Sequence, residues 1–77
     1  MDVQVKLYGI FQKYAPVGRQ DFNMELPSVT TVDGVLKILK IPLDQDHILL
    51  VNGRRSETDR MLESGDTIVV FPPLAGG

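Results

Sequence analysis

The most informative absence from this 77-residue sequence is cysteine, of which there is none. Without a thiol the chain can form no disulfide bond, no thiolate metal site and no iron–sulfur cluster. It also has no cysteine nucleophile, so catalysis through a thiolate is excluded.

Clustered positive charge and long apolar runs are missing as well. The eight basic residues are scattered, with Arg54-Arg55 the only adjacent pair, and the net charge is −2. Because phosphate binding needs a clustered basic footprint, nucleic acid is not expected as a partner. No apolar stretch approaches the roughly 18 residues that span a membrane. The opening MDVQVKLYG lacks the layout of a signal peptide, so we expect a cytoplasmic location and no membrane partner.

Residues that catalyse reactions or bind metals form no recognisable set. The one histidine, His47, stands beside Asp46 at the expected start of a strand, where an edge or surface position is the usual outcome. Asp44 and Asp46 could be a metal-binding pair, but no further carboxylates complete an oxygen shell. Neither a G-x-S-x-G sequence nor a phosphate loop is present. We therefore expect no metal site, no bound cofactor and no enzyme activity of this chain alone.

The sequence does contain enough apolar residues for one small globular domain spanning 1–77. Hydrophobic residues make up 43% of the chain and charged residues 23%, which excludes a disordered protein. Apolar and polar residues alternate at 3–7 and 21–26, which predicts two half-buried strands. One or two helical turns are expected at 10–15, between these strands.

A single amphipathic helix is predicted after the second strand. Thr31 is the expected N-cap, and Asp33 places a negative charge in the first turn, where it suits the helix dipole. Pro42 is expected to close the helix from beyond its end. The apolar face follows helical spacing and consists of Val32, Val35, Leu36 and Leu39, widened by Ile38.

The second half of the sequence predicts three further strands, at 47–51, 54–57 and 67–71. Asn52-Gly53 favours a type I′ turn, and Asp59 is expected to cap a helical turn at 60–62. This order of elements predicts an α+β domain in which one helix covers one face of a mixed sheet. It suits a β-grasp roll with the first and last strands as parallel neighbours at the centre.

Two of these strands, at 48–51 and 68–71, are apolar on both faces. If Ile68 and Val70 face the helix, Val69 and Phe71 face away from it. The outward residues then form either a second core layer under loops or an exposed surface on which a partner docks. The sequence leaves both open, and the position beside the C-terminal tail favours docking.

The sequence closes with FPPLAGG, which predicts a projecting tail at 72–77. Pro72-Pro73 stiffen the exit from the last strand. Gly76-Gly77 remove every side chain from the last part of the backbone, so this segment could enter a narrow channel and present an unhindered carboxylate. The alternative is a frayed end that happens to contain two glycines.

The whole chain resembles the MoaD/ThiS family of sulfur carriers, which are β-grasp relatives of ubiquitin. The segments that carry the resemblance are VKLYGIFQKYAPVGRQ, the TTV helix entry, ILLVNGRR and LESGDTIVVFPP. The ending FPPLAGG resembles that of the small subunit of molybdopterin synthase in particular. Thiamine-pathway carriers share the Gly-Gly but usually have a shorter start and no Pro-Pro.

The resemblance implies that the carboxylate of Gly77 is adenylated and then converted to a thiocarboxylate. It implies two partners: a ubiquitin-activating-type adenylyltransferase, which would use the ATP and any zinc, and the large catalytic subunit of molybdopterin synthase, in a heterotetramer. The absence of cysteine is consistent, because the terminal acid is the only evident covalent handle. The residues expected to bind partners are Val69, Phe71, Pro72, Pro73, Leu74 and Gly76.

Other functions stay open on the sequence. The chain could carry sulfur for thiazole, cysteine or thiolated tRNA. It could instead be a ubiquitin-like modifier that is joined through Gly77 to lysine amines. It could also be a β-grasp interaction module with an inert tail.

Overall fold

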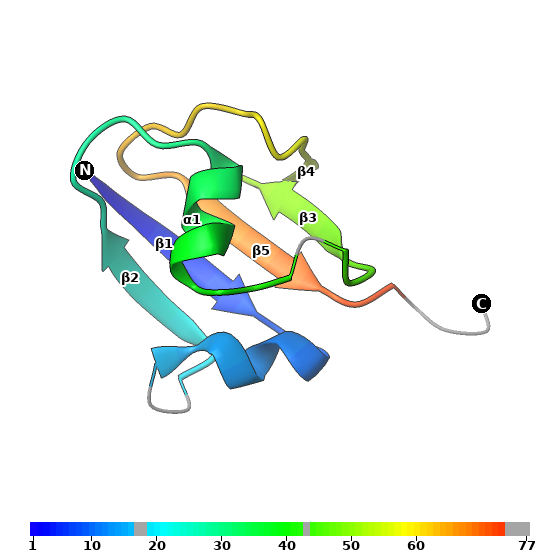
Figure 1. Cartoon of the computed structure of the whole chain (residues 1–77). Helices are drawn as coiled ribbons and strands as arrows, with labels where there is room; N and C mark the ends of the chain where they lie inside the picture. Colours follow the sequence, from blue (N-terminus) through cyan, green and yellow to red (C-terminus); the bar gives the residue numbers. More distant parts are fainter. Residues whose placement is uncertain (17–18, 43, 74–77) are drawn as a thin grey trace.

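Over residues 1–16, 19–42 and 44–73, which the computed structural model describes, the chain forms a five-stranded mixed sheet with one α-helix (Figure 1). The elements in chain order are β1 (Asp2–Leu7), the 3₁₀ helix η1 (Gly9–Tyr14), β2 (Asp21–Glu25), α1 (Val32–Ile38), β3 (Ile48–Val51), β4 (Arg54–Arg55) and β5 (Thr67–Phe71). None of the helices in these residues is long and apolar enough to cross a membrane.

The first and last strands lie side by side at the centre of the sheet. The strand order is β2-β1-β5-β3-β4. β1 and β5 run parallel, whereas the other neighbouring pairs are antiparallel. Parallel neighbours need a long crossover connection, and η1, β2 and α1 all belong to that crossover. This arrangement confirms the predicted α+β class and the order of a β-grasp roll.

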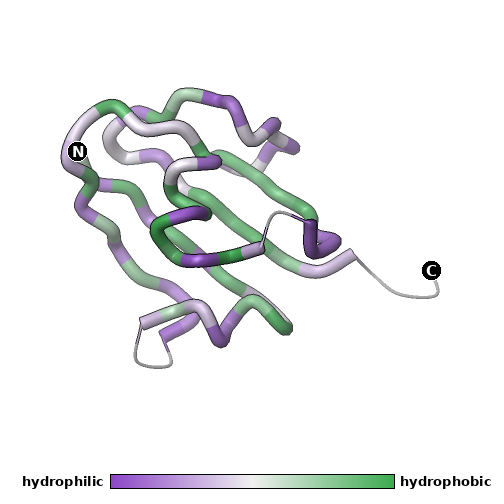
Figure 2. The backbone as a smooth tube through the Cα atoms, in the orientation of Figure 1, coloured by the Kyte–Doolittle hydropathy of each residue, from purple (hydrophilic) through white to green (hydrophobic). Residues whose placement is uncertain are grey.

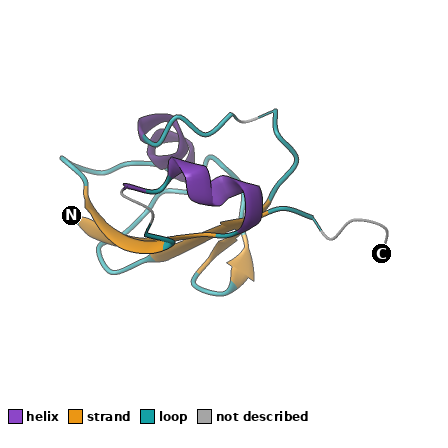
Figure 3. Ribbon diagram, turned by 90° about the horizontal axis from the view of Figure 1, so that it is seen from below, coloured by secondary structure: helices purple, strands orange, loops and turns teal. Residues whose placement is uncertain are grey.

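Both helices cover the same face of the sheet, and the core lies between them and the strands (Figure 3). Ile68 and Val70 are fully buried on this inner face, as the alternation predicts. Three loop residues, Leu26, Ile41 and Leu62, close the core at its margins. The other buried apolar residues are Val3, Val5, Leu7, Phe11, Phe22, Val32, Val35, Leu36, Leu49 and Val51.

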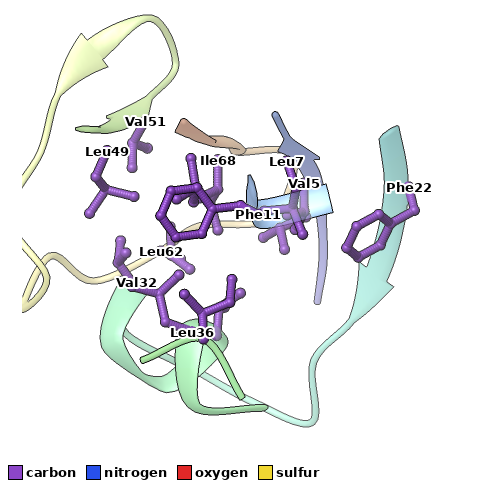
Figure 4. Packing of buried hydrophobic residues seen from close by; sticks show 14 of the residues in the cluster. Val5, Leu7, Phe11, Phe22, Val32, Leu36, Leu49, Val51, Leu62 and Ile68 are labelled. Carbon is purple, nitrogen blue, oxygen red and sulfur yellow. The ribbon is translucent and has the colours of Figure 1, made fainter. Parts of the chain in front are cut away.

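Phe11 is the largest of the fully buried side chains. It comes from η1, and its ring lies in the middle of the labelled core side chains in Figure 4, with Phe22 at one side. The ring of His47 meets it edge-on, with centroids 6.4 Å apart and planes at 85°. The helical turns predicted between the first two strands therefore exist, and they supply a central core residue.

The boundaries of α1 are set by hydrogen bonds at both ends. The Thr31 hydroxyl accepts from the Gly34 N–H at 3.1 Å, which confirms the predicted N-cap. At the other end Lys40 is left-handed, with φ of 64°, and the Ile41 N–H donates to the Leu36 carbonyl at 2.9 Å. This is a Schellman motif, so the helix ends before Pro42 is reached.

Two details of the sequence prediction are wrong. Ile38 does not widen the apolar face, because its side chain is 54% exposed; at 100° per residue it lies roughly 110° from the middle of that face. The segment 60–62 is not helical. Its Leu62 N–H donates to the Thr30 carbonyl and its Arg60 carbonyl accepts from the Val32 N–H. The segment is extended because its backbone groups pair with the entry to α1.

Asp66 is a charged residue that is nevertheless buried: only 6% of its surface is exposed. One carboxylate oxygen accepts from the Glu63 N–H at 2.8 Å, and the other accepts from the Asn52 side-chain amide at 2.9 Å. The Asn52 carbonyl oxygen in turn accepts from the Thr67 N–H at 2.9 Å. These bonds tie the β3–β4 turn to the start of β5. The bond from Glu63, followed by that from Asn52, holds the pKa of Asp66 below its ordinary value of 3.8.

The lowered pKa of Asp66 predicts a loss of stability in acid. A carboxyl whose pKa is lower in the folded than in the unfolded state stabilises the fold above the unfolded pKa, and this contribution is lost as the pH falls through the folded pKa. Asp66→Asn should lower the free energy of unfolding at pH 7 by about 1–3 kcal/mol. It should also remove part of the fall between pH 6 and pH 3, measured by urea unfolding. Asp59→Asn, on an exposed turn, is the matched control and should change the free energy of unfolding at pH 7 by no more than about 0.5 kcal/mol.

Candidate functional site

The base of the predicted tail continues directly from the central strand of the sheet (Figure 1). β5 ends at Phe71, Pro72 is half-buried, and Pro73 is exposed. The reason for the end of the strand is local, because Pro72 has no N–H to continue the ladder. Leu74, Gly76 and Gly77, which the sequence assigns to partner binding and to the reaction, lie outside the described residues.

Four apolar side chains meet on the outer face of the sheet, the face away from α1. Ile48 lies opposite Phe71, and Leu50 lies opposite Val69, in the antiparallel register of β3 and β5. We call these four residues the outer patch. Val69 and Phe71 therefore face away from the helix as predicted, and Figure 2 shows the continuous hydrophobic colour of both strands.

The outer patch does not belong to the core that the described residues form. Each of its four side chains is half-buried, whereas the inward residues of β5 are completely buried. Within the described ranges, both helices lie on the opposite side of the sheet (Figure 3). Contiguous apolar surface of this kind on a small domain is typical of an interaction site.

Positive charge flanks the outer patch on two sides. Lys6 on β1 lies beside Val69 in the parallel register, and Arg55 on β4 lies opposite Leu50. A partner surface that fits has an apolar centre and acidic groups at its rim, because opposite charges across an interface favour association and fix its register. Phe71 joins the patch to the tail, since it directly precedes Pro72.

The remaining candidates from the sequence are His47, Asp44 and Asp46. His47 is half-buried against Phe11, and its Nδ1 lies 2.8 Å from the Gln45 carbonyl oxygen. Asp44 and Asp46 are exposed. In the part of the chain that the structure describes, no three histidine, aspartate or glutamate side chains are grouped to hold a metal ion.

A cleft at the edge of β3 and β4 includes neither Pro72 nor Pro73 in its lining. The residues that line it are His47, Leu49, Arg55, Ser56, Glu57 and Thr58. It contains charges of both signs, which specify no class of ligand.

Sequence reasoning found half of the outer patch and missed its surroundings. The apolar runs of both strands signalled that each has an outward apolar row. The pairing of Ile48 with Phe71, and the placement of Lys6 and Arg55 beside the patch, depend on strand order and register. Those are long-range properties that no local pattern contains.

Comparisons with known proteins agree with this geometry. A protein from Pyrococcus furiosus, described as a candidate subunit 1 of molybdopterin converting factor, is 28% identical, with a TM-score of 0.77 over 95% of this chain and 98% of that chain. SAMP1 from Haloferax volcanii has a TM-score of 0.79 at 21% identity over the whole of both chains.

A third similar structure is a complex of subunits 1 and 2 of molybdopterin-converting factor from Helicobacter pylori. It gives a TM-score of 0.68 at 20% identity over the whole of both chains. At such identities this structure and SAMP1 share the fold with this chain. A search of the curated proteins found no match.

The match to a protein-family model extends over most of the sequence. The model of the ThiS family covers residues 5–77. The matched range begins within β1 and includes the outer patch and the Gly76-Gly77 end. The chain therefore belongs to the ThiS family, within the MoaD/ThiS group of ubiquitin-like sulfur carriers that its sequence resembles.

Proposed function

We propose that this chain is a sulfur carrier for molybdopterin synthesis, and that the sulfur is held as a thiocarboxylate on Gly77. The observation that carries the proposal is the family match, which extends through the Gly-Gly end of the sequence. The similarity to a candidate subunit 1 of molybdopterin converting factor supports molybdopterin as the pathway. The FPPLAGG ending supports the same choice.

The chemistry needs an activated carboxyl group. A carboxylate resists attack by sulfur because its leaving group would be oxide. Attack of a Gly77 oxygen on the α-phosphorus of ATP releases pyrophosphate and gives an acyl-adenylate, in which AMP is a good leaving group. Sulfide released by a donor then attacks the carbonyl carbon and displaces AMP, and loss of the sulfide proton leaves the thiocarboxylate. Glycine suits this position because no side chain hinders the approach to the carbonyl carbon.

In this proposal the catalytic groups belong to partners, and the chain is not an enzyme by itself. An adenylyltransferase of the ubiquitin-activating type supplies the ATP site, and a large synthase subunit receives the tail. The Helicobacter pylori complex pairs subunit 1 with subunit 2, which supports a large-subunit partner, and we propose a heterotetramer. The outer patch docks the domain while the tail enters the partner's active site. We also propose a cytoplasmic location and no cofactor bound by the chain itself.

A modifier role is the second candidate. Its support is the similarity to SAMP1, because a further structure of that Haloferax volcanii protein is described as small archaeal modifier protein 1. Attack on the same acyl-adenylate by a thiol and then a lysine amine would give a protein conjugate. Blots of the native host against this chain would show a ladder of higher masses if it is a modifier.

Intact mass spectrometry tests the proposed function. The chain is incubated with its cognate activating enzyme, ATP and a sulfur donor. We expect a mass gain equal to sulfur replacing oxygen, localised to Gly77 by fragmentation. Deleting Gly77, or adding one residue after it, should abolish the gain and leave the circular dichroism spectrum unchanged. If the extended variant is thiolated as well as the parent, the Gly77 carboxylate is not the site.

A further inference from the structure

The residue packed against the base of the tail is Gly9, at the start of η1. Its backbone is left-handed, with φ of +59°, a region that strains residues with a side chain. A Cβ atom at this position would lie 2.8 Å from Cγ and 2.9 Å from Cδ of Pro72. Two carbon atoms prefer about 3.5–4.0 Å. The Pro72 ring therefore lies where a side chain at position 9 would be.

The hydrogen bonds around this contact explain why β1 and β5 separate here. The Tyr8 N–H donates to the Val70 carbonyl at 3.0 Å and continues the parallel ladder. In this register the next bond would run from the nitrogen of residue 72 to the Tyr8 carbonyl, but Pro72 has no N–H. The Tyr8 carbonyl accepts instead from the Phe11 N–H at 3.1 Å, which closes the first turn of η1. One strand turns away through Gly9 as the other ends at Pro72.

We infer that Gly9 is a positioning residue for the tail. Its missing side chain lets Pro72 lie against η1, and this contact sets the direction in which the chain leaves the sheet. The reacting carboxyl group is five residues beyond Pro72, a reach of roughly 17 Å when extended. The direction of the chain at Pro72 therefore limits the region that the Gly77 carboxyl group can reach. This consequence rests on the proposed function.

Adenylation kinetics separate positioning from docking. In Gly9→Ala the outer patch is unchanged, so KM for the carrier should stay within about twofold, while kcat falls about tenfold because the carboxylate is misplaced. Gly53→Ala is the matched control. Gly53 is also left-handed, with φ of +84°, but nothing lies within 4 Å of the added Cβ. The Gly53→Ala variant therefore has the same kind of backbone strain without a steric clash, and it should keep the parent's kcat.

A double variant tests whether the Pro72 ring is the partner. Pro72→Ala removes both ring atoms that a Cβ at position 9 would meet. Gly9→Ala combined with Pro72→Ala should have the kcat of Pro72→Ala alone, because changes that act on one contact are not additive. Two results overturn the inference: additive losses in the double variant, or a loss in Gly53→Ala equal to that in Gly9→Ala.

A measurement without the activating enzyme distinguishes this inference from the proposed function. Nuclear Overhauser cross-peaks between the α-protons of Gly9 and the ring protons of Pro72 are expected in the parent and in Gly53→Ala. They should be weakened or lost in Gly9→Ala. If the parent lacks these cross-peaks, the inference is wrong whatever the adenylation result. If the parent shows them but is not adenylated, the proposed function fails and the steric role of Gly9 is supported.

Discussion

Phe71→Ala should weaken binding to the large subunit or the activating enzyme about thirtyfold, with only a small loss of stability. An aromatic side chain at the centre of an interface can contribute about 2 kcal/mol or more. Phe71 has the properties of such a residue, since it is half-buried on the outer face and lies between the patch and the tail. Because Phe71 is only partly exposed, its truncation should cost about 1–2 kcal/mol of folding free energy, less than the roughly 3–5 kcal/mol of a fully buried phenylalanine. Calorimetric titration with each partner, together with thermal unfolding, measures both quantities.

Ile38→Ala is the control for this prediction. Ile38 is an apolar residue that is 54% exposed on α1, which lies against the opposite face of the sheet. Its truncation should leave both affinities unchanged. If Phe71→Ala instead lowers the melting temperature strongly while the folded fraction binds normally, Phe71 supports the fold and the docking role of the outer patch is wrong.

Phe11→Ala should cost about 3–5 kcal/mol of unfolding free energy, the usual range for a buried aromatic residue. The side chain is fully buried, and the rings of His47 and Tyr14 lie 6.4 Å and 6.5 Å from it. A domain of this length has roughly 4–12 kcal/mol in total, so the variant should be close to unfolding at 37 °C. Urea unfolding at 25 °C gives the difference directly.

Ile10→Ala changes the neighbouring residue in the same 3₁₀ helix and is the matched control. Ile10 is 50% exposed, so its loss should stay within about 0.5 kcal/mol, as for most surface substitutions. If both variants lose the same small amount, η1 contributes little to the core and Phe11 is not its central residue.

Most features that the sequence predicted correctly have a local cause, whereas the parallel pairing of the first and last strands was predicted from the order of the elements. Period-two alternation predicted the strands and the outward direction of Val69 and Phe71, and the Thr31 cap depends on groups three residues apart. Of the two incorrect predictions, the one about Ile38 misjudged its angle around the helix, and the other involves distant pairing. The segment 60–62 is extended because it pairs with the entry to α1, where the Thr30 carbonyl accepts from the Leu62 N–H. A turn signal at Asp59 does not reveal this pairing.

For the candidate site, too, the features with a local signal were predicted, and those that depend on distant residues were not. The apolar runs and the FPPLAGG ending are visible in the sequence, so the outward row and the tail were predicted. The contact of Gly9 with Pro72 joins residues 63 positions apart through the parallel register. The hydrogen bond between Asn52 and Asp66 likewise forms only when two separate turns lie side by side. The roles of Leu74, Gly76 and Gly77 stay predictions.

The central position of β5 has a consequence for how this fold forms. β5 holds β1 on one side and β3 on the other, so the β2-β1 pair and the β3-β4 pair are joined only when residues 67–71 lie between them. A variant truncated before β5 lacks the strand that joins the two halves of the sheet, and we therefore expect it not to fold.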